Sequence, residues 1–329
     1  MKILITGGAG FIGSTVATAC LGAGITPVIL DDLSTGRREF TEGRVAYEGD
    51  IADAALLDQI FAEHPDIAAT IHCAAKIVVP DSVADPVTYY DNNVARTFAL
   101  VGHLLRLGCT RLLFSSSASI YAPGADLTVD EHSGLAPASP YARTKLVVEL
   151  FLADVAAATG MRVLSLRYFN PIGADPLLRT GLQLAAPSHA VGKLLEAYAA
   201  RTPFQVTGVD YATRDGSAIR DYIHVWDLAL AHVAALREMD RIVEPGTALP
   251  INVGTGNGTT VRELVAAFRA IVGDFEAVDA PPRPGDVIGS YTRSDRAAEL
   301  LGWKAERSLE DGLRDSLAWL DRRPEVLGF

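Results

Sequence analysis

The sequence predicts an α/β fold in which a doubly wound parallel sheet is followed by a smaller C-terminal α/β lobe. In the first half of the chain, short apolar runs rich in β-branched residues alternate with segments long enough to be helical crossovers. This alternation is typical of a parallel sheet that helices cover on both faces. After about residue 170 it gives way to loops rich in glycine, proline and aspartate, which indicates a second lobe. The 329 residues, 49% of them hydrophobic, suffice for two unequal lobes.

Six runs are the candidate strands of this sheet, and most of the gaps between them leave room for a helix. They are KILITGG (2–8), TPVILDD (26–32), VAYEGDI (45–51), ATIHCAA (69–75), RLLFSSSA (111–118) and RVLSLRYFN (162–170). Three later segments have helical character: HAVGKLLEAYAA (189–200), DLALAHVAALREM (227–239) and TVRELVAAFRAIV (260–272). We expect a first domain over residues 1–172, to which segments of about 218–258 return, and a second lobe over residues 173–329.

Composition and charge exclude several classes of function. A formal net charge of -11 argues against broad binding to nucleic acid or anionic membranes, so backbone amides and a few arginines must hold any phosphate. No apolar run reaches the roughly 18 to 20 residues that a bilayer requires, and MKILITGG lacks the cleavage region of a signal peptide. Cys20, Cys73 and Cys109 lie far apart in apolar surroundings, as expected of buried reduced thiols. We expect a cytoplasmic protein that binds no nucleic acid, membrane or metal.

A glycine-rich turn after the first strand predicts a dinucleotide site. Gly7, Gly10 and Gly13 have the spacing GxxGxxG and lead into a helical segment that starts with Phe11 and Ile12. Glycines here permit a tight turn, a close approach of the backbone to a diphosphate, and tight packing of the helix on the strand. The alternative is a simple strand-to-helix turn. The position at the head of a Rossmann-type pattern favours dinucleotide binding.

Acidic residues at the end of the second strand indicate NAD rather than NADP. A carboxylate of Asp31 or Asp32 would accept hydrogen bonds from the adenosine ribose hydroxyls and would repel a 2′-phosphate. Arg37 and Arg38 follow within reach and weaken that preference. Alternatively, either aspartate is a turn residue that caps LSTG.

Further positions lie along the expected path of the cofactor. Asp50 and Ile51 end the third strand, where the carboxylate would accept from the adenine amino group and the isoleucine would lie against its face. Alternatively, Asp50 is the N-cap of the next helix. Ala74 and Ala75 are small enough to leave room for the ligand. Asn93 either binds backbone near the nicotinamide end or satisfies a buried helix.

The stretch SPYARTK (139–145) places a tyrosine and a lysine on one helical face. Tyr141 and Lys145 are four residues apart, so their side chains would project together. An ammonium group and a positively charged nicotinamide would stabilise a phenolate and lower the tyrosine pKa. Ser117, at the end of the fifth strand, supplies a hydroxyl that can relay a proton. Taken alone, the pair is better interpreted as a surface tyrosine and a solvated lysine, but its position behind a dinucleotide turn and a serine-rich strand end favours catalysis.

Taken together, these motifs resemble the extended short-chain dehydrogenase/reductase family, the NAD-dependent epimerases and dehydratases. The resemblance rests on TGGAGFIG (6–13), SSSA (115–118), the YxxxK spacing and RYFNPIGA (167–174). Within that family, three stretches are similar to the UDP-glucose (UDP-galactose) 4-epimerases: RDYIHVWDLALAH (220–232), INVGTGNGTTV (251–261) and RPGD (283–286). The likeness covers essentially the whole chain.

The resemblance implies an isomerase of nucleotide sugars in galactose metabolism. In that family hydride passes from C4 of the hexose to tightly bound NAD, the 4-keto sugar turns over, and hydride returns to its other face. Carried onto this sequence, Tyr141 is the base and later the acid, Ser117 is its proton partner, and Lys145 holds the ribose and tunes the tyrosine. Ser115 and Tyr168 would contact the cofactor, the tyrosine at its nicotinamide end.

The same resemblance implies a set of residues for the nucleotide sugar. Asn170 would contact the sugar diphosphate, Arg220 and Arg283 would clamp its phosphates, and Asp286 would accept from the uridine ribose. Each is alternatively a member of a surface ion pair, and for Arg220 the neighbouring Asp221 is a strong competitor.

Three positions depart from the family pattern. Gln183 lies in GLQLAAPSHAVGK (181–193), where relatives carry an Asn- or His-Leu-hydrophobic-Pro segment, and we expect it to contact the uracil or diphosphate. Lys76 stands one place earlier than a family lysine, and we include it among the substrate contacts with its role open. Ser290, next to Tyr291, aligns where some relatives carry a bulky tyrosine, so a 2-acetamido group would have room.

The implied function is therefore interconversion of UDP-glucose and UDP-galactose, with other assignments kept as alternatives. Ser290 motivates a UDP-N-acetylglucosamine 4-epimerase. A dehydratase or decarboxylase needs an acid after the catalytic serine, and Ser117 is followed by Ala-Ser-Ile. A catalytically silent NAD-binding regulatory protein would not need both Tyr141 and Lys145. The resemblance also implies a homodimer formed through helices near residues 86–107 and 140–160.

Overall fold

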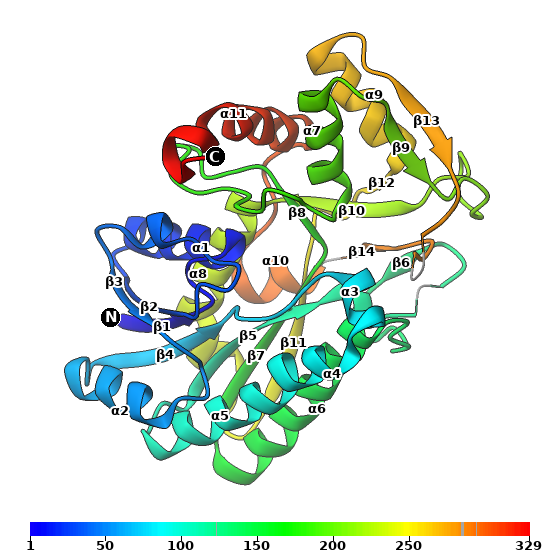
Figure 1. Cartoon of the computed structure of the whole chain (residues 1–329). Coiled ribbons are helices and arrows are strands. Elements are labelled where there is room, and N and C mark those ends of the chain that lie inside the picture. Colours follow the sequence, from blue (N-terminus) through cyan, green and yellow to red (C-terminus); the bar gives the residue numbers. More distant parts are fainter. Residues whose placement is uncertain (123, 284–285, 294) are drawn as a thin grey trace.

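The computed structural model describes residues 1–122, 124–283, 286–293 and 295–329, and its largest feature is a parallel sheet of seven strands. The strand order is β11-β7-β5-β4-β1-β2-β3, and every neighbouring pair runs parallel (Figure 1). The strands are β1 (Lys2–Thr6), β2 (Thr26–Asp31), β3 (Val45–Glu48), β4 (Ile67–His72), β5 (Arg111–Ser117), β7 (Arg162–Tyr168) and β11 (Ala248–Val253). This sheet confirms the predicted α/β class, with the order reversing at β1 and β4 as in a Rossmann-type fold.

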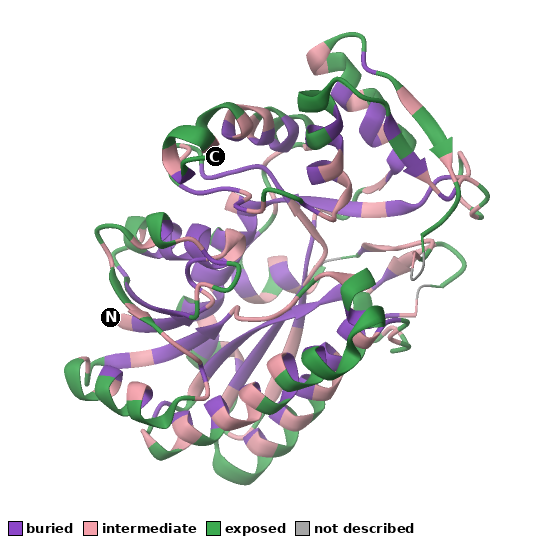
Figure 2. Cartoon of the chain, viewed as in Figure 1, coloured by how far each residue is buried: buried purple, intermediate pink, exposed green. Residues whose placement is uncertain are grey.

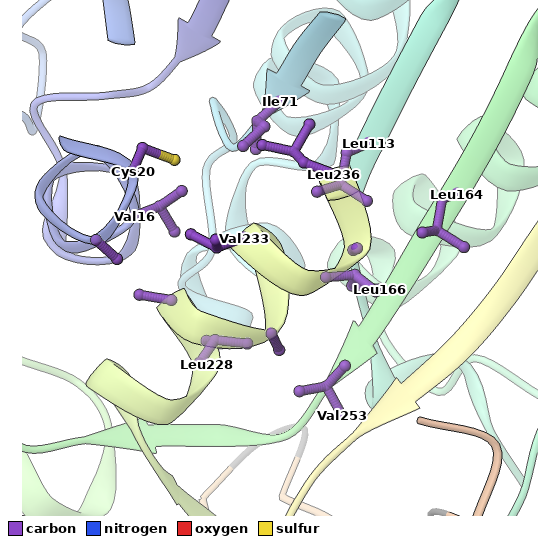
Figure 3. Packing of buried hydrophobic residues seen from close by; sticks show 14 of the residues in the cluster. Val16, Cys20, Ile71, Leu113, Leu164, Leu166, Leu228, Val233, Leu236 and Val253 are labelled. Atoms are coloured by element: carbon purple, nitrogen blue, oxygen red, sulfur yellow. The ribbon is translucent and has the colours of Figure 1, made fainter. Parts of the chain in front are cut away.

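Alternating side chains give the sheet two separate apolar faces. Ile5 and Leu113 belong to one buried cluster, whereas their neighbours Leu4 and Leu112 belong to another. Figure 3 shows the first cluster, with Leu113 beside Leu236 of the covering helix. The first face is covered by α1 (Phe11–Gly22), α8 (Val225–Ile242) and α10 (Asp295–Leu301), and the second by α2 (Ala54–Glu63), α5 (Arg96–Arg106) and α6 (Pro140–Thr159).

A smaller α/β lobe lies against one end of this sheet. Its mixed sheet has the order β12-β10-β8, and a separate parallel pair joins β9 to β13. These elements are β8 (Asn170–Ile172), β9 (Phe204–Thr207), β10 (Ile219–His224), β12 (Gly258–Thr260), β13 (Ala277–Ala280), α7 (Ala190–Ala200), α9 (Val261–Val272) and α11 (Leu309–Leu327). The cluster that includes Leu194, Phe268 and Leu313 is the core of this lobe. In Figure 2 both cores are buried and the outer faces of the helices are exposed.

Short elements complete the junction between the two regions. They are α3 (Val79–Ala84), α4 (Pro86–Tyr90), η1 (Arg38–Thr41), the π-helical η2 (Asp91–Ala95), η3 (Ala118–Ile120), β6 (Thr128–Val129) and β14 (Tyr291–Thr292). The chain passes between the regions more than once, since β10 pairs with β8 while the following α8 and β11 belong to the large sheet. The division near residue 172 stays a prediction.

Two general features of the described residues bear on function. No helix in the described ranges combines the length and the apolar character needed to cross a membrane. The same ranges contain no cluster of three or more His, Cys, Asp or Glu side chains arranged to hold a metal ion. The three cysteines are free thiols, with Cys20 and Cys109 buried.

Candidate active site

The glycine turn between β1 and α1 forms a cradle with no space for side chains. Gly7 has a φ of +69°, and a Cβ there would lie 2.6 Å from the backbone nitrogen of Ala74. A Cβ at Gly13 would lie 2.2 Å from the carbonyl oxygen of Gly7. Gly10 is the N-cap of α1 and no side chain of the described residues caps that end. The turn therefore offers the first amides of α1, including those of Phe11 and Ile12, to a diphosphate.

The two aspartates after β2 differ in their surroundings. Asp31 is 7% exposed, and its carboxylate accepts from the backbone nitrogens of Ala9 and Leu33, both at 2.9 Å. Burial raises the pKa of Asp31, and the bond from Ala9 opposes this. Asp32 is exposed and accepts from the backbone nitrogen and hydroxyl of Ser34. Both aspartates thus make the turn contact given as the alternative, and Asp31 also lies against the glycine turn.

The loop after β3 contains the next two residues of the expected cofactor path, Asp50 and Ile51. Asp50 accepts from the backbone nitrogen of Ala52 and forms an ion pair with Arg96. The alternative that Asp50 caps the next helix is wrong, because α2 begins at Ala54 and its N-cap is Asp53. Ile51 is buried in the core, 7% exposed.

Asn93 fixes the loop that follows β4. Its Oδ1 accepts from the backbone nitrogen of Lys76 at 2.8 Å, and its Nδ2 donates to the carbonyl oxygen of Lys76 at 2.9 Å and to Thr144 at 3.1 Å. The loop with Ala74 and Ala75 is therefore held against α6, beside the glycine turn. Asn93 binds backbone, as one reading expected, and it is itself buried.

The structure brings Ser117, Tyr141 and Lys145 together at the carboxyl end of the sheet. Tyr141 and Lys145 lie in the first turns of α6, whose N-cap Ser139 accepts from the backbone nitrogen of Ala142 at 3.2 Å. The exposed fractions are 8% for Ser117, 9% for Tyr141 and 4% for Lys145. These side chains are thus in a site from which water is largely excluded.

The electrostatics of this group depend mainly on burial. Burial raises the pKa of Tyr141, and a hydrogen bond with Ser117 lowers it. Burial lowers the pKa of Lys145 to about 8, opposed by Cys73 and Glu149. The ammonium of Lys145 donates to the carbonyl oxygen of Ser115 at 2.8 Å. Ser117 therefore acts directly on the phenol, while Lys145 is held at the strand end.

Ser115 is next to these residues in a group of neutral polar side chains with Cys73, Tyr168 and His232. The sequence analysis named only Ser115 and Tyr168 of this group as site residues. The Ser115 hydroxyl lies 3.2 Å from the Cys73 sulfur and 3.4 Å from Nε2 of His232. Burial raises the pKa of Tyr168 well above its usual value, and a hydrogen bond with Ser115 lowers it. His232 donates from Nδ1 to the carbonyl of Leu228 at 2.8 Å, and burial lowers its pKa to about 4. Nε2 of the neutral imidazole is thus an acceptor toward Ser115.

The predicted phosphate contacts gather in the smaller lobe. Arg220 donates to the carbonyl oxygens of Ile219, Val287 and Ile288 at 2.7 to 3.0 Å. The alternative of an ion pair with Asp221 is wrong. Asp221 lies on the other side of β10 and accepts from Thr255 and Gly256.

Arg283 and Asp286 pair with each other in this structure. A guanidinium nitrogen of Arg283 lies 3.1 Å from a carboxylate oxygen of Asp286. The alternative that these two residues form an ion pair is therefore confirmed. Both residues also affect the pKa of Arg220. Burial lowers this pKa, the carboxylate of Asp286 raises it, and the positive charge of Arg283 lowers it. Pro284 and Gly285 of the RPGD motif lie outside the described residues.

Tyr222 and His189 are further candidates that sequence reasoning missed. Tyr222 is 5% exposed, and its hydroxyl has no hydrogen-bond partner among the described residues. It lies two residues after Arg220, on the same side of β10, and pairs in register with Asn170 of β8. His189 caps α7 through Nδ1, and its buried Nε2 has no partner in the described ranges. The sequence contained a signal for Tyr222, because in a strand RDYIH places Tyr222 on the same side as Arg220.

The three departures from the family pattern occupy different places. Gln183 donates from Nε2 to the carbonyl oxygen of Thr35 at 3.1 Å, which places it at the loop after β2. Lys76 lies in the loop that Asn93 holds. The ring of Tyr291 packs on Gly258, where a Cβ would lie 2.5 Å from it. Ser290, the preceding residue, lies just outside β14 and is partly buried.

Comparisons with known proteins agree with this geometry. Residues 3–254 match the model of the NAD dependent epimerase/dehydratase family. A UDP-glucose 4-epimerase of Azospirillum brasilense is 42% identical over 322 residues, covering 97% of this chain and 91% of that protein. The structure of a UDP-glucose 4-epimerase from Stenotrophomonas maltophila, with bound NAD and formylated UDP-arabinopyranose, is 36% identical with a TM-score of 0.93 and covers 99% of both chains. That of a UDP-glucose 4-epimerase from Bifidobacterium longum, in complex with NAD+ and UDP, is 33% identical with a TM-score of 0.92, covering 99% of this chain and 100% of that one.

Proposed function

The chain belongs to the NAD dependent epimerase/dehydratase family, and on this premise we propose that it is a UDP-hexose 4-epimerase that interconverts UDP-glucose and UDP-galactose with bound NAD. The observation that carries the proposal is the buried set of Ser117, Tyr141 and Lys145 beside the glycine turn. A proton donor, a phenol and an ammonium group are the residues that reversible oxidation of a sugar hydroxyl requires.

The residues present fit the cofactor, because Gly7 and Gly13 allow a tight turn that side chains would disrupt, and the uncapped first amides of α1 are left for a diphosphate. When bound, NAD supplies the hydride chemistry at C4 of the hexose. Asp31 would hold the adenosine ribose, and Lys145 the nicotinamide ribose. Ser115 and Tyr168 would line the nicotinamide end.

Proton transfer is the part of the reaction that this chain's own residues perform. Tyr141 takes the proton of the 4-hydroxyl and later returns it, with Ser117 as the hydroxyl partner. Because burial raises the pKa of Tyr141, the phenolate needs the positive charge of Lys145 and of the oxidised nicotinamide. Burial also keeps water from the 4-keto sugar while it turns over.

The smaller lobe would hold the nucleotide diphosphate while the sugar moves. Arg220 and Arg283 would bind the phosphates, with Arg283 exchanging its ion pair with Asp286 for the ligand. Asp286 would then accept from the uridine ribose. Asn170 and Tyr222, adjacent across β8 and β10, would add neutral contacts to the diphosphate.

Ser290 favours a second activity, epimerisation of UDP-N-acetylhexosamines. Ser290 is small and partly buried, next to Tyr291, whose ring packs on Gly258. A 2-acetamido group would then have space that a bulky residue would fill. Dehydration is disfavoured, because the side chain after Ser117 that lies within hydrogen-bond distance of it is Ser119, at 2.9 Å, and a hydroxyl cannot replace the required carboxylic acid.

Assembly and location are proposals of the same kind. A homodimer is supported by the apolar side chains exposed on α3, α4 and α6, which are Val83, Val87, Tyr90 and Leu150. Three free thiols support a reducing, cytoplasmic location. We also propose residues 1–172 as the NAD domain, with segments of about 218–258 returning to it, because α8 and β11 pack on the large sheet.

The direct test is an assay of purified protein, without added cofactor, against UDP-galactose and UDP-N-acetylgalactosamine. We expect both 4-epimers to form without net absorbance change at 340 nm, and the Tyr141→Phe variant to retain NAD but lose activity by a factor of at least about 100. Full activity of Tyr141→Phe would overturn the mechanism. No turnover of the N-acetylated sugar by wild-type protein would remove the second activity alone.

A further inference from the structure

We propose that residues 181–184 form a strap that retains the bound dinucleotide, and that the carboxamide oxygen of Gln183 accepts a hydrogen bond from the adenosine ribose. The inference rests on the proposed function, because it takes NAD as the resident cofactor. It also moves Gln183 from the nucleotide sugar, where the sequence placed it, to the cofactor.

The helix α11 holds the strap from one side. The indole nitrogen of Trp319 donates to the carbonyl oxygen of Leu182 at 2.9 Å, and Arg323 donates to that of Leu184 at 3.1 Å. A Cβ at Gly181 would lie 2.5 Å from the indole ring, so the backbone there rests directly on Trp319. The strap is therefore fixed on both sides of Gln183, at Leu182 and at Leu184.

The side chain of Gln183 extends from the strap to the glycine turn between β1 and α1. Gln183 is 5% exposed and donates from Nε2 to the carbonyl oxygen of Thr35, in the loop that follows Asp31. The same Nε2 is 4.0 Å from the position of a Cβ on Gly10, the N-cap of α1. The carboxamide thus lies between the loop after β2 and the glycine turn.

The oxygen atom of the Gln183 carboxamide makes no hydrogen bond with the described residues. Oε1 of Gln183 is buried and has no hydrogen-bond partner in the described part of the chain. The amide orientation follows from its contact, because the carbonyl oxygen of Thr35 can only accept and so selects the nitrogen. A buried acceptor without a donor is unfavourable, which indicates that a ligand supplies the donor.

The chemistry of that donor identifies a ribose hydroxyl. Diphosphate oxygens are acceptors and would be repelled by Oε1 of Gln183. The adenine amino group is expected further along, at Asp50. In a Rossmann-type site the adenosine ribose would lie between these groups, beside Asp31, and its hydroxyls are donors. A 2′-phosphate would oppose both Oε1 and the carboxylate of Asp31, so Gln183 also favours NAD over NADP.

The test compares NAD retention in two matched variants. Gln183→Met keeps the length of the side chain and removes its hydrogen bonds, and Gln205→Met makes the same change at an exposed position on β9. The holoenzymes are diluted into NAD-free buffer, and the nucleotide that remains bound is quantified over time. We expect Gln183→Met to release NAD about tenfold faster than wild type, as expected for loss of one buried hydrogen bond, and Gln205→Met to match wild type.

A second measurement uses NAD analogues that lack the 2′- or the 3′-hydroxyl of the adenosine ribose. Wild-type protein should bind one of them more weakly than NAD, and Gln183→Met should lose part of that discrimination. Equal release rates and equal discrimination in Gln183→Met and wild type would overturn the proposal. If Gln183→Met does not fold, wild-type protein that binds both analogues as tightly as NAD overturns it instead. Wild-type protein that binds no NAD at all would refute the proposed function, whereas normal NAD binding with an unaffected Gln183→Met refutes only the strap.

Discussion

Replacing Glu149 by glutamine should loosen the framework that carries the reactive side chains. Glu149 of α6 and Arg167 of β7 form an ion pair whose side chains are 8% and 6% exposed. Arg167 donates from Nε to both carboxylate oxygens, at 3.0 and 3.1 Å, and Ser116 of β5 donates to the same carboxylate. The pair thus joins the three elements on which Lys145, Ser117 and Tyr168 lie.

The size of the effect follows from what remains after the substitution. Without the carboxylate, the guanidinium of Arg167 stays buried with one neutral contact, the hydroxyl of Tyr121 at 2.8 Å. Breaking a buried pair from one side costs about 3 to 5 kcal/mol, because an uncompensated charge is left behind. Glutamine keeps one acceptor oxygen, so we expect the free energy of unfolding to fall by about 3 kcal/mol.

Urea unfolding followed by circular dichroism measures this loss. The matched control is Glu48→Gln, whose carboxylate pairs with Arg38 at the surface, with exposed fractions of 54% and 70%. That variant should lose less than about 1 kcal/mol. The double variant Glu149→Leu/Arg167→Met should recover much of the stability, since a well-packed apolar pair can replace a buried ion pair. A loss in Glu149→Gln no larger than in the control would refute the reasoning.

Three further predictions test other parts of the structure. Gly13→Ala should lower NAD affinity at least about tenfold, because the new Cβ meets the carbonyl oxygen of Gly7 at 2.2 Å, whereas Gly22→Ala in the same helix meets nothing within 4 Å and should bind normally in a titration. Burial lowers the pKa of His72 to about 3, below the usual 6.5 of the unfolded chain, so stability falls as pH drops through the window from 6.5 to 3. Between pH 7 and 4.5, wild type should lose about 3 kcal/mol more than His72→Gln in urea unfolding, and equal losses would contradict the assignment. Leu150→Glu should convert dimers to monomers in light scattering, because Leu150 is 59% exposed on the proposed interface; the control Leu177→Glu, at a 72% exposed residue, should leave the dimer intact.

Local patterns were sufficient for six of the seven strands of the large sheet. Each of the six expected strands is present, because a buried parallel strand is a continuous apolar run and the turns after it are marked by glycine or aspartate. The seventh strand, β11, was not identified as one. Its segment ALPINV contains Pro250 and only its last three residues are buried, so the run is too short to stand out.

Pairings between distant residues were beyond the sequence. Gln183 contacts Thr35, 148 residues away, and no period of 2 or 3.6 encodes such a contact. The sequence analysis assigned no role to His232, and only the packing of α8 on β5 brings it to Ser115. For Asp31 and Asp32 the sequence left two roles open; both side chains make the turn contact, and only Asp31 also reaches the glycine turn.

The position of β11 at the edge of the large sheet has a consequence for how the polypeptide is made. Between the end of β7 and the start of β11 the ribosome must add about 80 residues, which takes roughly 4 to 16 s at 5 to 20 residues per second. During that interval β7 is an open edge with Val163, Leu164 and Leu166 on it. An uncovered apolar edge pairs readily with other chains. Slower translation through residues 169–247 is therefore expected to lengthen the time in which β7 can pair with other chains.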